Sequence, residues 1–289
     1  MYCIYSDKEI SQKAASKEHI IPLSLGGSGK FVISVDRERN AEIGSKIDGA
    51  LASDVVMQFL RKAHNVKGHS NKEVRVRLKS ARLPSTGDRV HVTFHRDQVE
   101  LYEVVNQRSL DAGLGRDVES KINVDAMCRA RFTAKVLLAS GYYIYGELFR
   151  RYADHSSLRT YMNRTFARSE TDAEYTNLGL YDPCSLVASA HVPTYETMKE
   201  ICAWFKSSCV MIMLCQDSLI GTVGILGELV ASINVHAKAE MFPNYEDYRL
   251  GHVIYCPNGN LVRKSFHDVA NELGRAIRSK SHICAERYA

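Results

Sequence analysis

Apolar residues near the start of the chain fall in short segments that alternate with glycines and polar turns. Residues 2–5, 17–22 and 31–35 are rich in β-branched and aromatic side chains and predict short strands. The glycines within residues 25–30 predict a loop. Asp36 is a suitable N-cap for a helix that continues through Asn40. The pattern therefore predicts strand, loop, strand and helix, which is a ββα unit.

The apolar spacing changes in the next part of the chain. Residues 54–63 carry apolar side chains at helical spacing and predict a second helix. Residues 73–78 and 89–105 alternate apolar and polar positions, as half-exposed strands do, with a turn near residues 96–98. Two glycines within residues 110–116 indicate a linker.

The remainder of the chain mixes helices and strands. Residues 124–152 predict a long amphipathic helix, broken at Gly141, in which Arg129, Arg131 and Lys135 supply polar positions. Short strands are expected at residues 184–191, 210–214, 219–223, 229–235 and 252–255, and helices at residues 194–205 and 265–278. This mixture predicts an α+β fold.

Composition restricts the class of protein. The 289 residues are 45% hydrophobic and 25% charged, enough to bury a sizeable core in two domains. No secretory signal opens the chain, and the most apolar stretch, residues 202–230, is interrupted by charged and polar residues. We therefore expect a soluble, cytoplasmic protein with no membrane partner. None of the eight cysteines forms a C-x-x-C pair, so neither a disulfide framework nor a zinc site is expected.

Positive charge is concentrated at the start of the chain. Residues 1–80 carry 14 Lys and Arg against 9 Asp and Glu, whereas the remaining 209 residues carry 24 of each sign. The excess peaks between Arg61 and Arg82, where eight basic residues face the single acid Glu73. Such a basic strip fits a polyanionic substrate, because phosphate neutralisation supplies most non-specific nucleic-acid affinity. A solvated strand face explains the strip equally well.

The densest chemical signal is Glu-His-Ile-Ile-Pro-Leu-Ser-Leu-Gly-Gly at residues 18–27, followed by Asn40. His19 lies on a strand that enters the glycine loop, and an imidazole suits the task of taking a proton from water. Glu18 projects to the other side of a regular strand, from which it could reach a metal held against the next helix. Asn40 offers an amide oxygen, and Mg²⁺ accepts few protein oxygens besides water and phosphate. A surface Glu-His pair and a helix-surface amide are the alternatives.

Three segments together resemble the HNH endonucleases, the ββα-metal or His-Me finger class. They are Cys-Ile-Tyr-Ser at residues 3–6, the Glu-His segment at residues 18–27, and Arg-Asn-x-x-Ile-Gly-Ser-Lys-Ile-Asp at residues 39–48. The resemblance implies that His19 is the general base and that Glu18 and Asn40 hold Mg²⁺ or Mn²⁺. It also implies a DNA substrate and a setting in restriction or antiphage defence. Less specifically, residues 65–70 and 131–138 look like segments that follow this unit in bacterial and phage proteins.

The sequence departs from the family pattern at the zinc positions. Members of this subtype often carry two C-x-x-C pairs, and these positions here read Cys3 with Ser6 and Asp36 with Arg39. Three of the four thiolates are missing, so no structural zinc is expected. The middle Asn or His of many members, expected near Phe31, is also absent. The finger must then be held by apolar packing, for which the candidates are Ile4, Ile20, Ile21, Phe31, Ile33 and Ile43.

We predict three parts, in which an HNH nuclease domain covers residues 1–72 and a β-rich connecting segment covers residues 73–117. Residues 118–289 would form a C-terminal α+β domain for recognition or oligomerisation. Candidate nucleic-acid contacts are polar residues near the motif: Lys30, Arg37, Arg39, Lys46, Lys67 and His69. A solvated helix face also explains the arginines and Lys46, and a turn position is the favoured interpretation of His69.

The predicted function is hydrolysis of DNA phosphodiester bonds, with RNA not excluded as a substrate. The rival hypothesis is a non-catalytic nucleic-acid-binding or regulatory protein whose HNH finger has decayed. A homodimer would supply the two sites that cutting both strands requires. The C-terminal part could serve target recognition, oligomerisation or the sensing of an activating ligand.

Overall fold

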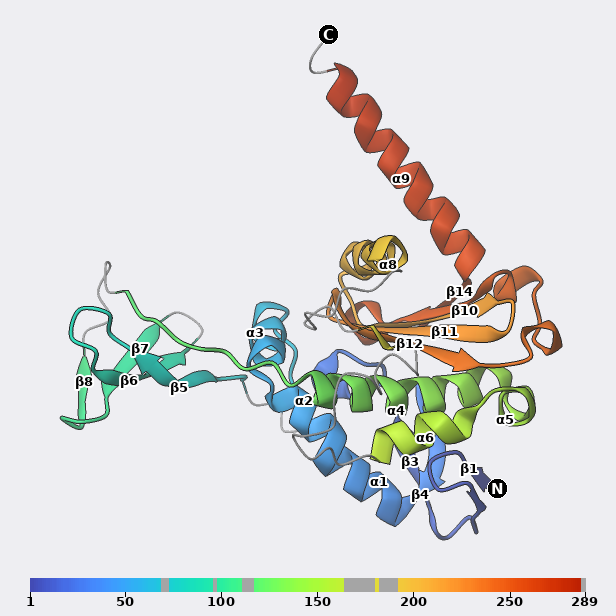
Figure 1. Ribbon diagram of the computed structural model, residues 1–289, viewed down its shortest axis with the longest axis horizontal. Helices are drawn as coiled ribbons and strands as arrows, with labels where there is room; N and C mark the ends of the chain where they lie inside the picture. The colour runs from blue at the N-terminus through green and yellow to red at the C-terminus, as the bar shows by residue number, and fades with distance from the viewer. Residues whose placement is uncertain (69–72, 96–97, 111–116, 164–179, 182–191, 287–289) are drawn as a thin grey trace.

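A computed structural model describes residues 1–68, 73–95, 98–110, 117–163, 180–181 and 192–286. The molecule is elongated, with a body of helices and a large sheet at one end and a small sheet at the other (Figure 1). The predicted strand at residues 184–191, the residues 96–97 of the expected turn and residues 111–116 of the expected linker lie outside the described residues.

The predicted ββα unit is present at the start of the chain. Strand β3 (Ala15–His19) pairs antiparallel with β4 (Val32–Asp36), and the register places Glu18 opposite Ile33. Helix α1 (Arg37–Ile43) follows directly, and the Asp36 side chain accepts a hydrogen bond from the Arg39 amide at 2.9 Å. The cap therefore forms as the sequence predicts. A short antiparallel pair, β1 (Tyr2–Cys3) and β2 (Lys8–Glu9), precedes the unit.

Short helical segments extend the unit toward the small sheet. A 3₁₀ turn, η1 (Leu23–Leu25), opens the glycine loop, and a π-helical turn, η2 (Gly44–Asp48), continues α1. Helices α2 (Gly49–Ser53) and α3 (Val55–Ala63) follow. Asp54 caps α3 by accepting a hydrogen bond from the Met57 amide at 3.1 Å. The second predicted helix is thereby confirmed.

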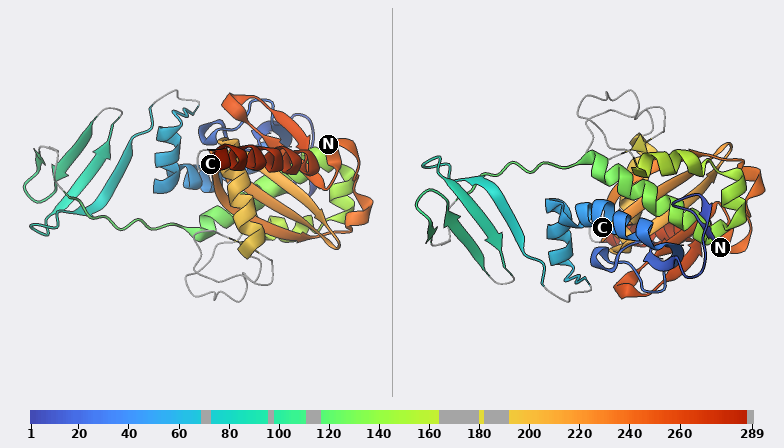
Figure 2. Two further views of the ribbon diagram at one scale, coloured as in Figure 1. Left: turned by 90° about the horizontal axis from the view of Figure 1, so that it is seen from above. Right: turned by 90° about the horizontal axis from the view of Figure 1, so that it is seen from below.

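The small sheet has its own core. Strands β5 (Val76–Arg82), β6 (Arg89–Phe94), β7 (Val99–Glu103) and β8 (Arg108–Leu110) pair in sequence order. Their inward side chains form a separate apolar cluster around Val90 and Leu101. Figure 2 shows this sheet standing away from the body of the molecule. The basic strip is consequently divided, because Arg61 and Lys62 lie on α3 and the arginines and lysine of β5 lie farther from β3 (Figure 1).

The long predicted helix is two helices, α4 (Ala126–Tyr145) and α5 (Glu147–Tyr152). The expected break at Gly141 is wrong, because Gly141 lies inside α4 and a Cβ there would overlap the ring of Phe149. The chain turns at Gly146, whose φ of +54° favours glycine. The expected polar stripe is also wrong, since Arg129 and Lys135 are 3% and 0% exposed. Helix α6 (His155–Asn163), which the sequence did not reveal, then packs on α4.

The large sheet separates two layers of helices. Its strand order is β14-β13-β10-β11-β12-β9 and all pairs are antiparallel. The bounds are β9 Leu180–Tyr181, β10 Cys209–Cys215, β11 Ser218–Ile225, β12 Glu228–His236, β13 Gly251–Tyr255 and β14 Val262–Ser265. Helix α4 packs on one face, while α8 (Val192–Phe205) and α9 (Phe266–Glu286) pack on the other. The apolar run of β10 is buried on both faces, with Val210 toward α4 and Met211 toward α8 and α9.

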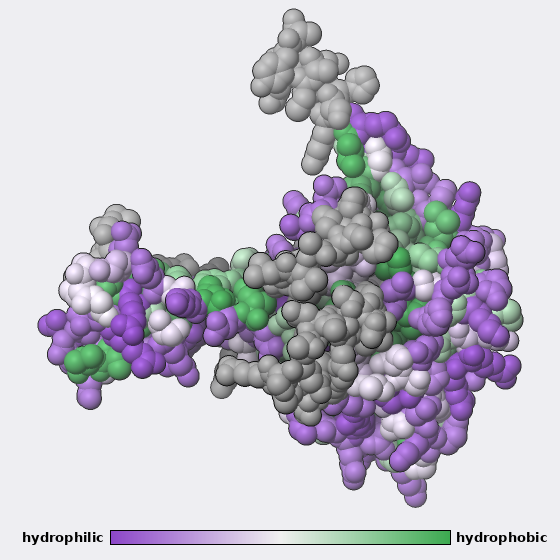
Figure 3. All heavy atoms as spheres, in the orientation of Figure 1, coloured by the Kyte–Doolittle hydropathy of each residue, from purple (hydrophilic) through white to green (hydrophobic). Residues whose placement is uncertain are grey.

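One apolar core joins the ββα unit to the C-terminal sheet. The same cluster contains Ile4 and Phe31 from the start of the chain, Phe132 from α4 and Val210 from β10. All six residues proposed to hold the finger together lie in it. The face in Figure 3 is mainly hydrophilic, with apolar side chains gathered along α9 where it leaves the sheet. None of the helices within the described residues is long and apolar enough to cross a membrane.

Candidate active site

The Glu18 carboxylate lies inside the protein. Strand alternation turns Glu18 inward, and the residue is 7% exposed. Its Oε1 lies 2.5 Å from Nζ of Lys135 on α4. The same ammonium lies 3.1 Å from Oδ2 of Asp48, the last residue of η2. A lysine from outside the ββα unit therefore links two acids of that unit.

Lys135 also fixes the strand that carries the motif. It is fully buried and donates hydrogen bonds to the carbonyl oxygens of His19 and Ile20, each at 3.1 Å. Burial lowers the pKa of this lysine, but the charges and hydrogen bonds of Asp48 and Glu18 outweigh burial and raise the pKa above its ordinary value. Lys135 is therefore an ammonium, and it holds both the Glu18 carboxylate and the backbone at His19.

Two buried acids share this one ammonium. Burial raises the pKa of Asp48 to about 6, opposed by the Lys135 charge and assisted by that of Glu18. Burial and the two carboxylates also raise the pKa of the Tyr5 hydroxyl well above its usual range. Neither Oδ1 of Asp48 nor the Tyr5 hydroxyl has a hydrogen-bond partner among the described residues. The cluster thus has surplus negative charge and unpaired oxygens.

Asn40 lies against the strand that carries Glu18. Its Nδ2 donates to the Lys17 carbonyl at 3.1 Å and to the Ser16 hydroxyl at 3.0 Å. These two contacts join α1 to β3 across 23 and 24 residues of sequence. The amide is consequently fixed next to the residue that precedes Glu18.

His19 ends strand β3, as expected for a residue that enters the glycine loop. Its side chain is half-buried and lies on the opposite face of the strand from Glu18. Gly26 has a φ of +76°, and a Cβ on Gly27 would overlap the Ile21 carbonyl oxygen. Both glycines of the motif therefore serve the tight turn that follows the histidine.

The donor set of this region suits a hard divalent cation with few protein ligands. The Glu18 carboxylate on β3 and the Asn40 amide on α1 are oxygen donors of the kind that Mg²⁺ accepts. The ion pair with Lys135 leaves the Glu18 carboxylate able to bind a metal as well, because a carboxylate has about four lone-pair sites. No group of three or more His, Cys, Asp or Glu side chains in the described part of the chain is arranged to hold a metal. Water and phosphate would have to complete the coordination.

The four positions that carry zinc ligands in the resembled subtype have other roles in this protein. The Cys3 thiol accepts a hydrogen bond from the Asp36 amide at 3.2 Å, and Asp36 caps α1. Arg39 pairs with Glu42, and Ser6 lies at the edge of a pocket that Arg39 also lines. These contacts tie the first turn to the start of α1 without a metal.

The predicted nucleic-acid contacts divide into two groups. Lys30 and Lys67 are exposed, and neither has an ion pair with the residues that the structure describes. Arg37 donates to the Lys13 and Ala15 carbonyls, while Arg39 and Lys46 both pair with Glu42. His69 lies outside the described residues. The helix arginines and Lys46 are thus partly engaged within the protein.

Sequence reasoning missed the two residues that surround Glu18. The sequence predicts Lys135 at a polar position of an amphipathic helix, yet it lies between Phe132 and Leu138 in a run of buried residues. Asp48 closes the third of the resembling segments without any assigned role. A single lysine inside an otherwise apolar helical stretch was the available signal, because a buried lysine requires an acidic partner.

Comparison with known proteins finds a family match at the start of the chain. Residues 3–55 match the family model described as HNH endonuclease. The N-terminal ββα unit therefore belongs to the HNH endonuclease family, whose members are generally nucleases that use divalent metals. No curated protein and no solved structure matches the chain.

Proposed function

We propose that this protein is a metal-dependent endonuclease that hydrolyses phosphodiester bonds of DNA, with His19 as the general base and Glu18 and Asn40 as metal ligands. The family match supplies the reaction class. The observation that carries the proposal is the pair of hydrogen bonds that fixes Asn40 against β3 beside Glu18. These bonds bring two oxygen donors, 22 residues apart in sequence, to one region of the ββα unit.

His19 removes the proton from the attacking water. The strand end and the glycine turn fix the position of its backbone, and Lys135 anchors its carbonyl oxygen. Such a base need only lie within hydrogen-bond reach of the water in the substrate complex. When bound, Mg²⁺ or Mn²⁺ would supply Lewis-acid stabilisation of the charge that develops on the phosphate and the leaving oxygen.

Lys135 positions the carboxylate of Glu18 and limits the charge of the site. Two buried carboxylates without a counter-ion would repel each other. The ammonium at 2.5 Å from Glu18 and 3.1 Å from Asp48 keeps a carboxylate available to a metal. A residue outside the matched segment thus supports the proposed site.

Nicking of supercoiled plasmid by the purified full chain tests this proposal. With Mg²⁺ or Mn²⁺ we expect relaxed and linear products, and we expect His19→Ala to lower the rate by about 10²–10⁴-fold, as loss of a general base does. His64→Ala is the matched control, because His64 is exposed and lies at the C-terminal end of α3. It should leave the rate unchanged.

The rival hypothesis gives a different outcome in the same assay. A decayed, non-catalytic finger would bind DNA while the wild type and His19→Ala were equally inert with every metal. Equal amounts of DNA and RNA in one reaction would distinguish the two substrates. For the proposed place in antiphage defence, plaque formation on cells with the wild type and with His19→Ala is the comparison, and equal plaque numbers would contradict it.

A further inference from the structure

A basic pocket lies between the ββα unit and helices α4 and α6. Its volume is about 370 Å³, within the range of roughly 300–1,000 Å³ typical of small-molecule sites. None of His19, Glu18 and Asn40 lines it. The lining combines α1 and η2 with one residue of α4 and the end of α6, so elements distant in sequence build it together.

The lining carries more positive than negative charge. Four cations, Arg39, Lys46, Arg131 and Arg159, surround the single carboxylate of Glu42. Glu42 is shared by Arg39 and Lys46. Arg131 is half-buried, donates to the Met162 carbonyl at 3.0 Å, and has no carboxylate partner among the described residues. Its charge is therefore available to a ligand.

Unpaired hydroxyl groups accompany these charges. Tyr5 and Ser6 both line the pocket, and their hydroxyls are buried with no hydrogen-bond partner in the part of the chain that the structure describes. Tyr5 is only 1% exposed. The Tyr5 hydroxyl belongs to the buried cluster of Glu18 and Asp48, so Ser6 supplies the unpaired hydroxyl of this pocket. A buried hydroxyl without a partner costs stability, so the Ser6 hydroxyl is suited to a ligand that accepts hydrogen bonds.

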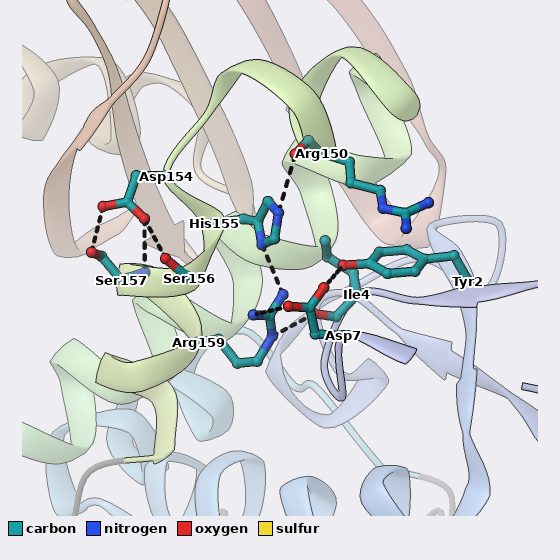
Figure 4. Close-up of polar contacts among 9 residues, drawn as sticks. All are labelled: Tyr2, Ile4, Asp7, Arg150, Asp154, His155, Ser156, Ser157 and Arg159. Carbon is teal, nitrogen blue, oxygen red and sulfur yellow. Dashed lines mark hydrogen bonds and ion pairs between the residues drawn. The ribbon is translucent and has the colours of Figure 1, made fainter. Parts of the chain in front are cut away.

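Arg159 is held in place before any ligand binds. Figure 4 shows its guanidinium among Asp7, the Ile4 carbonyl and His155. Its Nη1 lies 3.1 Å from the Asp7 carboxylate, its Nε donates to Ile4 at 3.1 Å, and its Nη2 donates to Nδ1 of His155 at 2.8 Å. Fixed guanidinium groups favour phosphate, because their planar donors match its oxygens.

We propose that this pocket binds a phosphate group of a small nucleotide-like ligand, recognised by Arg131 with the Ser6 hydroxyl and steered by the surrounding cations. This site is separate from the proposed catalytic residues and does not depend on nuclease activity. The same phosphate chemistry could come from a free nucleotide or from the backbone of a bound nucleic acid, and the volume of about 370 Å³ matches a small ligand.

Calorimetric titration of the full chain with inorganic phosphate, AMP and a short oligonucleotide tests this proposal. We expect AMP to bind, and Arg131→Gln and Ser6→Ala each to weaken it, Arg131→Gln by about tenfold as for removal of one charged hydrogen bond. Arg151→Gln is the matched control, because Arg151 is exposed on α5 and outside the pocket. It should leave the affinity unchanged. Ser6→Ala removes only a hydroxyl, so it also tests the site if Arg131→Gln fails to fold.

The three probes separate the outcomes. If phosphate and AMP show no binding up to millimolar concentration while both variants bind the oligonucleotide like the wild type, the pocket is not a phosphate site. Binding of AMP that neither pocket variant weakens would also overturn the proposal. Weakened oligonucleotide binding without AMP binding would support the phosphate site and identify nucleic acid as its source. Plasmid nicking, measured without added nucleotide, tests the nuclease proposal separately.

Discussion

At the scale of single residues, Lys135 has the most connections around the candidate site. It is the only cation within 4 Å of Glu18 and Asp48 among the residues that the structure describes. Removing one member of a buried ionic cluster leaves uncompensated charge, and this usually costs more than the cluster contributes as a whole. The stability of the ββα unit should therefore depend on a helix that lies about 90 residues later in the chain.

The change that tests this dependence is Lys135→Met, which keeps an unbranched apolar stem and removes the ammonium. We expect the free energy of unfolding to fall by about 3–5 kcal/mol, because two carboxylates lose their counter-ion. Urea denaturation measures it. Lys199→Met, at a site 53% exposed, should change stability by less than about 0.5 kcal/mol. A loss at Lys135 no larger than that of the control would show that the ammonium does not stabilise the two acids.

At the scale of helices and strands, hydrogen bonds of Arg159 join α6 to the start of the chain. His155, near the start of α6, receives a hydrogen bond from Arg159, and Arg159 bonds to Ile4 and Asp7 of the first turn (Figure 4). Nδ1 of His155 can accept this bond only when the imidazole is neutral. Burial, followed by the Arg159 charge, lowers the pKa of His155 below 6.5. The junction therefore depends on a neutral histidine.

This dependence gives a defined pH effect. The unfolded chain takes up a proton near pH 6.5, and the folded chain does so only at lower pH, so stability present above 6.5 is lost as the pH falls through the folded pKa. We expect His155→Asn, whose amide oxygen can accept from Arg159, to lose less stability between pH 7 and pH 5 than the wild type. Urea denaturation at each pH measures this difference. If His155→Asn and the exposed-site variant His64→Asn follow the wild-type curve alike, the junction does not depend on His155.

Local sequence patterns predicted the helices and strands well, but they did not predict which residues contact one another in the folded protein. The predicted cap at Asp36 begins a helix where expected, because a capping side chain bonds to amides two or three residues away. The break predicted at Gly141 is wrong. A glycine is required there because the Phe149 ring packs against it, and this contact forms only when α5 folds back on α4. The motif residues of the candidate site were proposed from their residue types, their spacing and the family resemblance. Lys135 was not, because its acidic partners lie 87 and 117 residues earlier in the chain.

At the scale of the whole molecule, the small sheet places basic side chains far from the body. Arg77, Lys79 and Arg82 on β5 are exposed, and none has an ion pair among the described residues. Figures 1 and 2 show this sheet at the end of the molecule opposite the C-terminal sheet. A long duplex bound at the candidate site could extend along the molecule toward this sheet. Under the proposed function, β5 would then contribute to DNA affinity without contacting the cleaved bond.

Replacing Arg77, Lys79 and Arg82 together by Gln tests this contribution. We expect weaker DNA binding and a plot of log affinity against log salt that is shallower by about 0.9 for each phosphate that the variant no longer neutralises. The rate of nicking at saturating DNA should be unchanged, because none of the three residues lies near His19. The matched control replaces exposed Lys199, Lys238 and Arg249 by Gln, which removes the same net charge from the body. Equal loss of affinity in both variants would mean that only total charge matters, and no loss in either would place the DNA away from the small sheet. The long-range attraction between DNA and the total charge of the protein is reduced equally in both variants. Only a difference between the two variants in the slope of log affinity against log salt therefore identifies direct binding of DNA at β5.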